Sequence, residues 1–344
     1  MRRKRMLWVV LLVVPLVLLA ADTLYWWIAA RNLQQGFADW AALQRANGRT
    51  ERNDATTLGG WPLAATLTVP AISLAGGSRE VAGSIDWNAE RIVLRVALTR
   101  PALLEILAEG RQQLRLGGYP GVPYTAGRLH LLMPLQATEW PSFIQVDADT
   151  LRADTPAGTA SLREAQLRLD FHPGARAGEP VLAASVHVED ASLPPGMVRP
   201  LGPSVADLEA KAILNGPLPA GGRPAEAAAS WRDGGGSLEV RHLALSWGPL
   251  ALTASATLAL DDQLQPMGAG NARIVGYAET LDALAAHSMI SRSAATAAKA
   301  VLSLLANAPD EGSPPEVEVP LTLQYRTLSM RQVPLLRLPE LDWP

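Results

Sequence analysis

The clearest pattern of hydrophobic and polar positions in the chain lies between residues 231 and 277. From 250 to 260, leucines and alanines fall on one side of an extended chain and small or polar residues fall on the other. This period of two is typical of a β-strand. Turn-forming residues at 234–236 and 247–249 separate such runs. Because these connections are too short for a parallel return, the pattern predicts antiparallel neighbours in a β-meander.

The same alternation recurs along most of the chain and sets the predicted fold class. Around position 167, Ala165, Leu167 and Leu169 share one face while Gln166 and Arg168 share the other, as in an antiparallel sheet with one wet face. We predict a mainly β (α+β) fold, built as a long twisted antiparallel β-sheet meander. Further strands are expected at 63–74, 85–98, 128–135, 143–151, 159–171, 181–189, 205–214, 226–231 and 317–325.

Three local details qualify this picture. A change of phase near Arg241 and His242 predicts a β-bulge. Residues 101–107 are interpreted as a short helix. Apolar residues in the alanine-rich stretch 279–307 recur at helical spacing, which predicts one or two helices with a break near Ser288.

The amino-terminal residues have the layout of a signal peptide or a signal anchor. A basic cluster precedes an apolar run that continues to Ala30. A helix over 7–30 would rise about 36 Å, which is enough for a hydrocarbon core of about 30 Å. We expect an uncleaved transmembrane helix, with a cleaved signal or a buried structural helix as alternatives. The predicted membrane-anchor residues are Arg2, Arg3, Lys4, Arg5, Tyr25, Trp26 and Trp27.

The flanks of this segment predict its orientation. Basic residues are retained in the cytoplasm, and aromatic residues favour the membrane interface. We therefore expect a single-pass protein of a bacterial inner membrane with most of the chain in the periplasm. After the anchor, Leu33, Phe37, Trp40 and Leu43 recur at spacings of three or four. They predict an amphipathic helix, which either forms a stalk or packs on the first strands.

The predicted organisation has four parts. A transmembrane helix at 1–30 and a stalk helix at 31–48 precede two β-sheet halves. The proline-rich segment 193–203 is the candidate boundary or hinge. The halves are expected at 49–193 and 204–344, the second with helices at about 279–307.

Composition removes several classes of function. The chain has 344 residues and a formal charge of −3, so without the four basic residues at 2–5 the remainder carries −3 − 4 = −7. Such an acidic body without basic stripes gives no support to nucleic-acid binding. The sequence contains no cysteine, which excludes disulfides and thiolate metal sites.

Candidate chemistry is sparse. The five histidines are scattered without metal-ligand spacing, and the adjacent carboxylates Glu189–Asp190 and Asp261–Asp262 lie at strand ends, where turn formation explains them. No catalytic or phosphate-binding motif is present in the sequence. We expect no enzyme activity, no cofactor and no metal.

The carboxyl-terminal half carries a family resemblance. The stretch 258–268, the strand to Tyr277, the alanine-rich segment and the closing VPLTLQYRTLSMRQVPLLRLPEL resemble an uncharacterised bacterial family, domain of unknown function 2125. Gly60-Trp61-Pro62-Leu63 before an early strand fits it as well. That family is loosely similar to AsmA-like envelope proteins, which combine an inner-membrane anchor with a long twisted periplasmic sheet. The resemblance implies no catalytic residues.

Two functions remain open from the sequence. The first is a membrane-anchored periplasmic protein that binds or presents lipid in an apolar groove. The second is a non-enzymatic scaffold or assembly factor that binds envelope proteins through sheet edges and its proline-rich tail. The expected partners are the inner membrane, lipid or envelope proteins, and no nucleic acid. Ordinary core packing is the alternative use of the candidate groove residues, which are Leu250, Leu252, Ala254, Ala256, Leu258 and Leu260.

Overall fold

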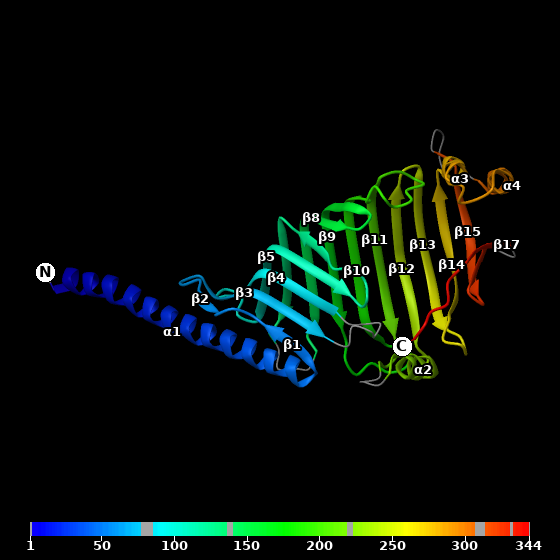
Figure 1. Cartoon of the computed structure of the whole chain (residues 1–344). Helices are drawn as coiled ribbons and strands as arrows, with labels where there is room; N and C mark the ends of the chain where they lie inside the picture. Colours follow the sequence, from blue (N-terminus) through cyan, green and yellow to red (C-terminus); the bar gives the residue numbers. More distant parts are fainter. Residues whose placement is uncertain are drawn as a thin grey trace. The chain divides into compact units, whose positions relative to one another are not determined.

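The computed structural model describes residues 2–76, 85–135, 140–218, 223–306, 314–330 and 333–343 and is mainly β, as predicted (Figure 1). The chain forms two compact units, Met1–Ala137 and Thr138–Pro344. Within the described part of each unit, every strand pairing is antiparallel. Consecutive long strands are paired neighbours, which is the predicted meander.

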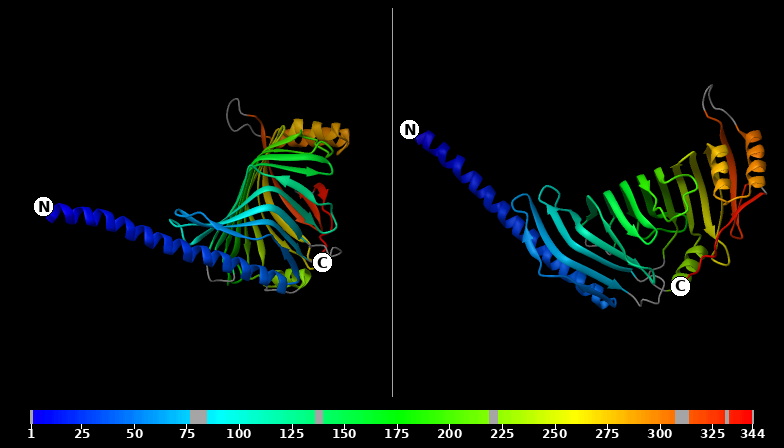
Figure 2. Two further views of the ribbon diagram at one scale, coloured as in Figure 1. Left: turned by 60° about the vertical axis from the view of Figure 1, so that its left-hand side comes forward. Right: turned by 45° about the horizontal axis from the view of Figure 1, so that its top comes forward.

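Unit 1 consists of one long helix and a sheet. The helix α1 spans Arg2–Ala46, so the predicted anchor and the predicted amphipathic helix are one continuous element. Its first part projects beyond the sheet, and its second part lies along the sheet (Figure 2). The strands are β1 (Arg49–Arg52), β2 (Thr57–Gly59), β3 (Ala64–Gly76), β4 (Ile85–Ala97), β5 (Leu103–Leu116), β6 (Val122–Thr125) and β7 (Arg128–Pro134).

The core of unit 1 lies between α1 and β3. Leu67 and Val69 of β3 are 0% exposed, and Ala30 and Leu33 of α1 pack into the same cluster. On the α1 side the contact also includes Trp26, whose indole Nε1 donates to the carbonyl oxygen of Gly59 at 3.1 Å. The spacing of these α1 residues is helical, so one stripe of the helix is buried. The second of the two sequence alternatives, packing on the first strands, is therefore confirmed.

Unit 2 is built from strands that twist progressively from one to the next (Figure 2). The described registers pair each strand from β8 to β17 with the next strand in the chain. The strands are β8 (Phe143–Thr155), β9 (Gly158–Phe171), β10 (Pro180–Ser192), β11 (Ser204–Asn215), β12 (Ser237–Trp247), β13 (Leu250–Leu260), β14 (Pro266–Val275), β15 (Glu316–Gln324), β16 (Thr327–Met330) and β17 (Val333–Arg337).

In the described part of unit 2, three helices accompany the strands. They are α2 (Pro224–Asp233), α3 (Tyr277–Ala286) and α4 (Arg292–Leu305). The predicted break near Ser288 is confirmed, because this residue has a φ of 58° between α3 and α4. The core of this unit lies where α3 and α4 meet β14 and β15, around Val317 and Val319.

The bulge in β12 is confirmed. The register between β12 and β13 shifts between Val240 and Leu243, which brings leucines on both sides of the shift onto one face. That face continues across neighbouring strands, where Val186, Ala210 and Leu243 stand in one cross-strand row. None of the apolar-face residues in β9 to β12 is buried, so the middle of this face remains half-exposed.

Two local predictions were wrong. Residues 226–231 belong to α2 and not to a strand, because the Trp231 ring packs on Gly236 and its Nε1 donates to the carbonyl oxygen of Asn215. A Cβ atom on Gly236 would lie 2.3 Å from that ring. Residues 103–107 begin β5 instead of forming a helix, because they pair with β4 and β7.

The proline-rich segment 193–203 connects two paired strands inside unit 2. It joins β10 to β11, and the amide of Leu193 donates to the carbonyl oxygen of Pro203 at 2.8 Å. The compact units divide at 137/138 instead, so their limits differ from the predicted halves.

Candidate functional site

Unit 1 contains an apolar groove between α1 and the sheet, with a volume of about 620 Å³. That size is within the range of about 300–1,000 Å³ that is usual for small-molecule sites. We call it the α1 groove. Its lining residues come from α1, β3, β4, β5, β7 and the ends of those strands. They are Tyr25, Ile28, Ala29, Asn32, Leu33, Gly36, Phe37, Trp40, Ile72, Trp87, Ile92, Leu94, Val96, Pro101, Leu104, Ile106, Leu131, Met133 and Leu135.

One face of α1 forms the wall of the α1 groove. Ile28, Asn32 and Gly36 recur at i, i+4 spacing on the side that borders the stripe packed on β3. Gly36 leaves this wall open, because a Cβ atom built there would meet nothing within 4 Å. Farther along, the rings of Phe37 and Trp40 stack with centroids 5.7 Å apart. This wall of the groove therefore has free space at Gly36 and an aromatic surface at Phe37 and Trp40.

The floor of the α1 groove is the apolar face of the sheet. Leu94 pairs with Leu67 of β3 on one side and with Ile106 of β5 on the other, and Ile106 pairs with Leu131 of β7. Charged residues such as Arg95 alternate onto the opposite face, where its guanidinium binds Glu105 at 2.8 Å. Within the described lining, no side chain is charged. The groove can therefore hold a hydrocarbon chain but offers no charge to an ionic ligand.

Among the predicted anchor residues, Tyr25 lines the α1 groove. Tyr25 and Trp27 are 40% and 47% exposed, and the Arg31 guanidinium lies 4.4 Å from the centre of the Trp27 ring. Trp26 instead packs against the core of unit 1. The part of α1 from 13 onward is long and apolar enough to cross a membrane. The structure describes the backbone of Arg2, Arg3, Lys4 and Arg5 as the start of this helix.

The predicted groove on β13 is divided between two environments. Leu252 and Ala254 pack against the core beneath α3 and α4. Leu258 and Leu260 line a second apolar cavity of about 450 Å³ together with Trp231 and the carboxyl-terminal tail. Leu250 and Ala256 are half-buried. A ligand site on this strand stays a prediction.

The family of the chain follows from comparison with known proteins. A family profile described as an uncharacterized protein conserved in bacteria (DUF2125) matches residues 26–339. The chain belongs to the DUF2125 family. The match begins at Trp26, the residue of α1 that hydrogen bonds to β2. No curated protein and no solved structure matches this DUF2125 chain.

Sequence reasoning on the DUF2125 chain missed the α1 groove. The helical spacing of Phe37 and Trp40 and the alternation of Ile92 and Leu94 were both visible. Their convergence on one cavity depends on α1 lying along the sheet, which no local pattern reveals. The signal that could have suggested it is the unusual run of aromatic residues on a helix next to a strand-rich segment.

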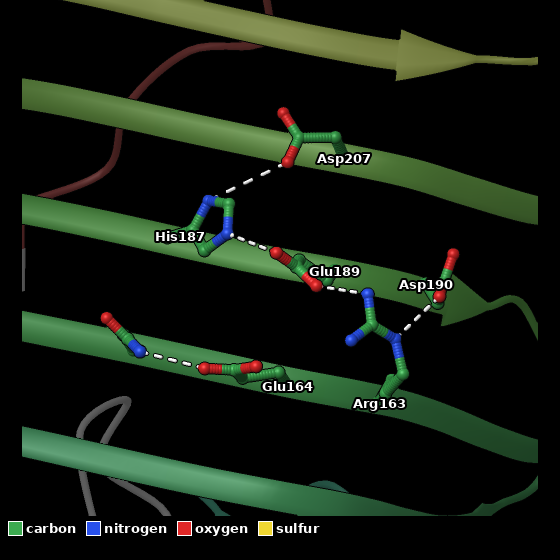
Figure 3. Close-up of polar contacts among 7 residues, drawn as sticks. Arg163, Glu164, His187, Glu189, Asp190 and Asp207 are labelled. Carbon is green, nitrogen blue, oxygen red and sulfur yellow. Dashed lines mark hydrogen bonds and ion pairs between the residues drawn. The ribbon is translucent and has the colours of Figure 1, made fainter.

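The polar face of the unit 2 sheet, opposite the half-exposed apolar face of β9 to β12, carries a cluster of charged groups (Figure 3). Arg163 binds both adjacent carboxylates, Glu189 and Asp190, and its Nε lies 2.7 Å from Asp190 Oδ2. His187 Nε2 lies 2.9 Å from Glu189 Oε1, and its Nδ1 lies 3.7 Å from Asp207. Glu189 and Asp190 lie within β10 and not at a strand end as expected, and they link neighbouring strands by binding one arginine of β9. In this cluster Arg163 and His187 are each paired with carboxylates, and the side chains are partly exposed to solvent.

We expect His187 in this cluster to titrate above the ordinary histidine value of 6.5. The hydrogen bond to Glu189 raises the pKa of His187 and is the largest effect. Partial burial lowers this pKa by less, and the negative charges of Asp207, Glu189 and Glu209 each raise it by a smaller amount. Because the folded pKa exceeds the unfolded one, this contribution to stability is complete below about 6.5. It is lost as the pH rises through the folded pKa.

Ring NMR titration of His187 measures this directly. Glu189→Gln is expected to move the pKa down toward 6.5, since the acceptor that favours the imidazolium loses its charge. A wild-type His187 that titrates at or below 6.5 would contradict the geometry in Figure 3.

Proposed function

We propose that this chain is a membrane-anchored, non-enzymatic protein of the bacterial cell envelope that holds the acyl chain of an amphiphile in the α1 groove. One observation carries the proposal: the helix that is long and apolar enough to cross a membrane also forms the wall of an uncharged apolar groove. Tyr25 lines that groove and belongs to the aromatic group expected at the membrane interface. An acyl chain could therefore pass from a leaflet into the groove without crossing open water.

The dimensions support an acyl chain as occupant. From Tyr25 to Trp40, α1 rises about 22 Å at about 1.5 Å per residue. One leaflet of a hydrocarbon core of about 30 Å is about 15 Å deep. Transfer from water stabilises a buried acyl chain by about 0.8 kcal/mol per methylene, but transfer from a bilayer is close to neutral. The groove is therefore suited to receiving and presenting a lipid and not to trapping it.

The envelope location follows from the flanks of α1. The basic residues at 2–5 favour a cytoplasmic amino terminus. The strands of both compact units would then lie on the periplasmic side of the inner membrane.

The scaffold function lacks a comparable supporting feature. The proline-rich tail proposed for partner binding, 333–339, is engaged within unit 2, because β17 pairs with β16. Beyond it, the Leu341 amide donates to Gln265 Oε1 at 2.9 Å and Trp343 Nε1 donates to the carbonyl oxygen of Leu264 at 3.0 Å. Protein partners remain a hypothesis from the sequence.

Native mass spectrometry of the full chain, released from mild detergent after incubation with 1-monooleoylglycerol, tests the proposal. We expect a species with a bound amphiphile that survives removal of the micelle. A spectrum that shows only the bare chain at saturating amphiphile would refute the proposed function.

A further inference from the structure

One end of the unit 1 sheet exposes large apolar side chains. Leu58 of β2 is 42% exposed, and in the turn that follows Trp61 is 48% exposed and Leu63 is 78% exposed. We call residues 58–63 the β2–β3 turn. These three side chains lie outside the core of unit 1. Neighbouring exposed apolar side chains of this size mark contacts with a protein or with a membrane.

The backbone of the β2–β3 turn is fixed by the sheet. Gly60 has a φ of 89°, and a Cβ atom there would lie 2.5 Å from the carbonyl oxygen of Ala64. The Ala64 amide donates to the carbonyl oxygen of Gly60 at 3.0 Å, and the Leu98 amide donates to that of Leu63 at 3.2 Å. The exposed side chains are therefore presented by ordered backbone at the strand ends.

The β2–β3 turn lies on the amino-terminal side of the length of α1 that packs on the sheet. Trp26 Nε1 donates to the carbonyl oxygen of Gly59, and β2 pairs with the first part of β3. Farther along α1, Gln44 accepts a hydrogen bond from Arg49 of β1, which pairs with the last part of β3. The hairpin of β2 and β3 therefore points to the same side as the projecting first part of α1 (Figure 1).

The level of Trp26 along α1 places the turn relative to a bilayer. Asp22 is the first acidic residue of the chain and follows the apolar run, so the hydrocarbon core would end near it. Trp26 lies four residues farther, a rise of about 6 Å at about 1.5 Å per residue. The polar layer on each side of a hydrocarbon core is also about 6 Å thick. The turn would then lie in the interfacial layer, which tryptophan favours.

The charges at this end of the sheet also suit a lipid surface. Neither 57–63 nor the neighbouring turn 98–102 contains a carboxylate, and the Arg100 side chain is 59% exposed. Lipid phosphates attract arginine and repel carboxylates. Pro101, next to this arginine, and Tyr25 both line the α1 groove. This end of the sheet therefore also contains one end of the groove.

We propose that the β2–β3 turn inserts Trp61 and Leu63 into the interfacial layer of the membrane that α1 enters. This inference rests on the membrane anchoring in the proposed function. The helix and the turn would make two separate contacts with the bilayer. Together they would hold the end of the α1 groove that Tyr25 and Pro101 line against the leaflet.

A single fluorescent label on the full chain in vesicles of phosphatidylethanolamine and phosphatidylglycerol tests this proposal. The sequence contains no cysteine, so Leu63→Cys can carry one environment-sensitive dye. Tyr119→Cys, in an exposed loop at the opposite end of the unit 1 sheet, is the reference position. We expect the dye at 63 to emit at shorter wavelength than the dye at 119. We also expect severalfold stronger quenching at 63 by a lipid with a nitroxide near its head group.

Two further measurements separate insertion of the turn from anchoring and from folding. Leu16→Cys, in the apolar part of α1, reports on the anchor and should be quenched by a lipid with a nitroxide at the chain end. Leu63→Asp, combined with the dye at Leu58→Cys, should lose most of the quenching and keep the wild-type melting temperature, because Leu63 is exposed. Leu304→Asp changes a leucine on α4 that is 86% exposed and should alter neither quantity.

The outcomes distinguish this inference from the proposed function. A dye at 63 that is quenched as weakly as the dye at 119, while Leu16→Cys is quenched, would overturn the inference and leave the anchor standing. Such a turn would be free for a protein partner. Quenching at Leu58→Cys that Leu63→Asp does not change would also overturn it.

Failure of the proposed function gives different results. An unquenched Leu16→Cys would overturn the membrane anchoring and the inference together. Quenching at 63 in a chain that binds no 1-monooleoylglycerol would support the inference and refute the groove function.

Discussion

Gly36→Trp is expected to lower the occupancy of 1-monooleoylglycerol at least tenfold while the chain remains folded. Gly36 lines the α1 groove, and a Cβ atom added there meets nothing within 4 Å, so a larger side chain can start from this position without a clash. The ring would take the volume that the acyl chain needs. Binding by native mass spectrometry and folding by circular dichroism measure the two effects separately.

Two controls accompany this variant. Gly36→Ala adds one methyl group and should preserve binding, and it should stabilise the chain by about 1 kcal/mol because glycine is unfavourable inside a helix. Gln34→Trp places the same indole about 200° around the helix at an exposed position outside the lining. If Gly36→Trp bound monooleoylglycerol as the wild type does, the α1 groove would not be the binding site.

Cysteine labelling is expected to give an all-or-none result for the orientation of the chain. The sequence contains no cysteine, so each introduced thiol reports on one position. Tyr119 is 77% exposed in the loop before β6, and a Tyr119→Cys thiol should react with a membrane-impermeant maleimide in intact spheroplasts. Met6→Cys leaves the basic residues at 2–5 unchanged and should react only after the membrane is opened.

The opposite labelling pattern would contradict the proposed location in the cell envelope. A Tyr119→Cys thiol protected in intact spheroplasts and reactive after lysis would place unit 1 in the cytoplasm. Release of the chain by carbonate extraction would argue against the transmembrane helix itself.

Much of the sheet could be predicted because its determinants are local. The alternation through Leu252 and Ala254 fixed the strand, and the change of phase at Arg241 fixed the bulge. Where a short run fits two structures, long-range contacts decided. Residues 226–231 became a helix because Trp231 packs on Gly236, and 103–107 became a strand because β4 and β7 flank it.

The candidate site was less predictable for the same physical reason. The sequence indicated an amphipathic helix after the anchor. It could not show that the exposed side of this helix lines a cavity. Gln112 of β5 illustrates the limit most clearly. It is preceded by Gly110, which has a φ of 78° where the register between β4 and β5 shifts. Because of this irregularity, the sequence pattern does not show which face of the sheet Gln112 and Gln113 occupy. In the structure Gln112 is buried and Gln113 is exposed.

The most direct measurement is photo-cross-linking from inside the α1 groove in native membranes. A benzoylphenylalanine at position 32 lines the groove, and one at position 34 lies outside it at a similar height along α1. Groove binding predicts that the chain labelled at 32 forms a lipid adduct detectable by mass spectrometry and that the chain labelled at 34 forms much less. Equal adduct formation at both positions, or none at 32, would contradict lipid binding in the groove.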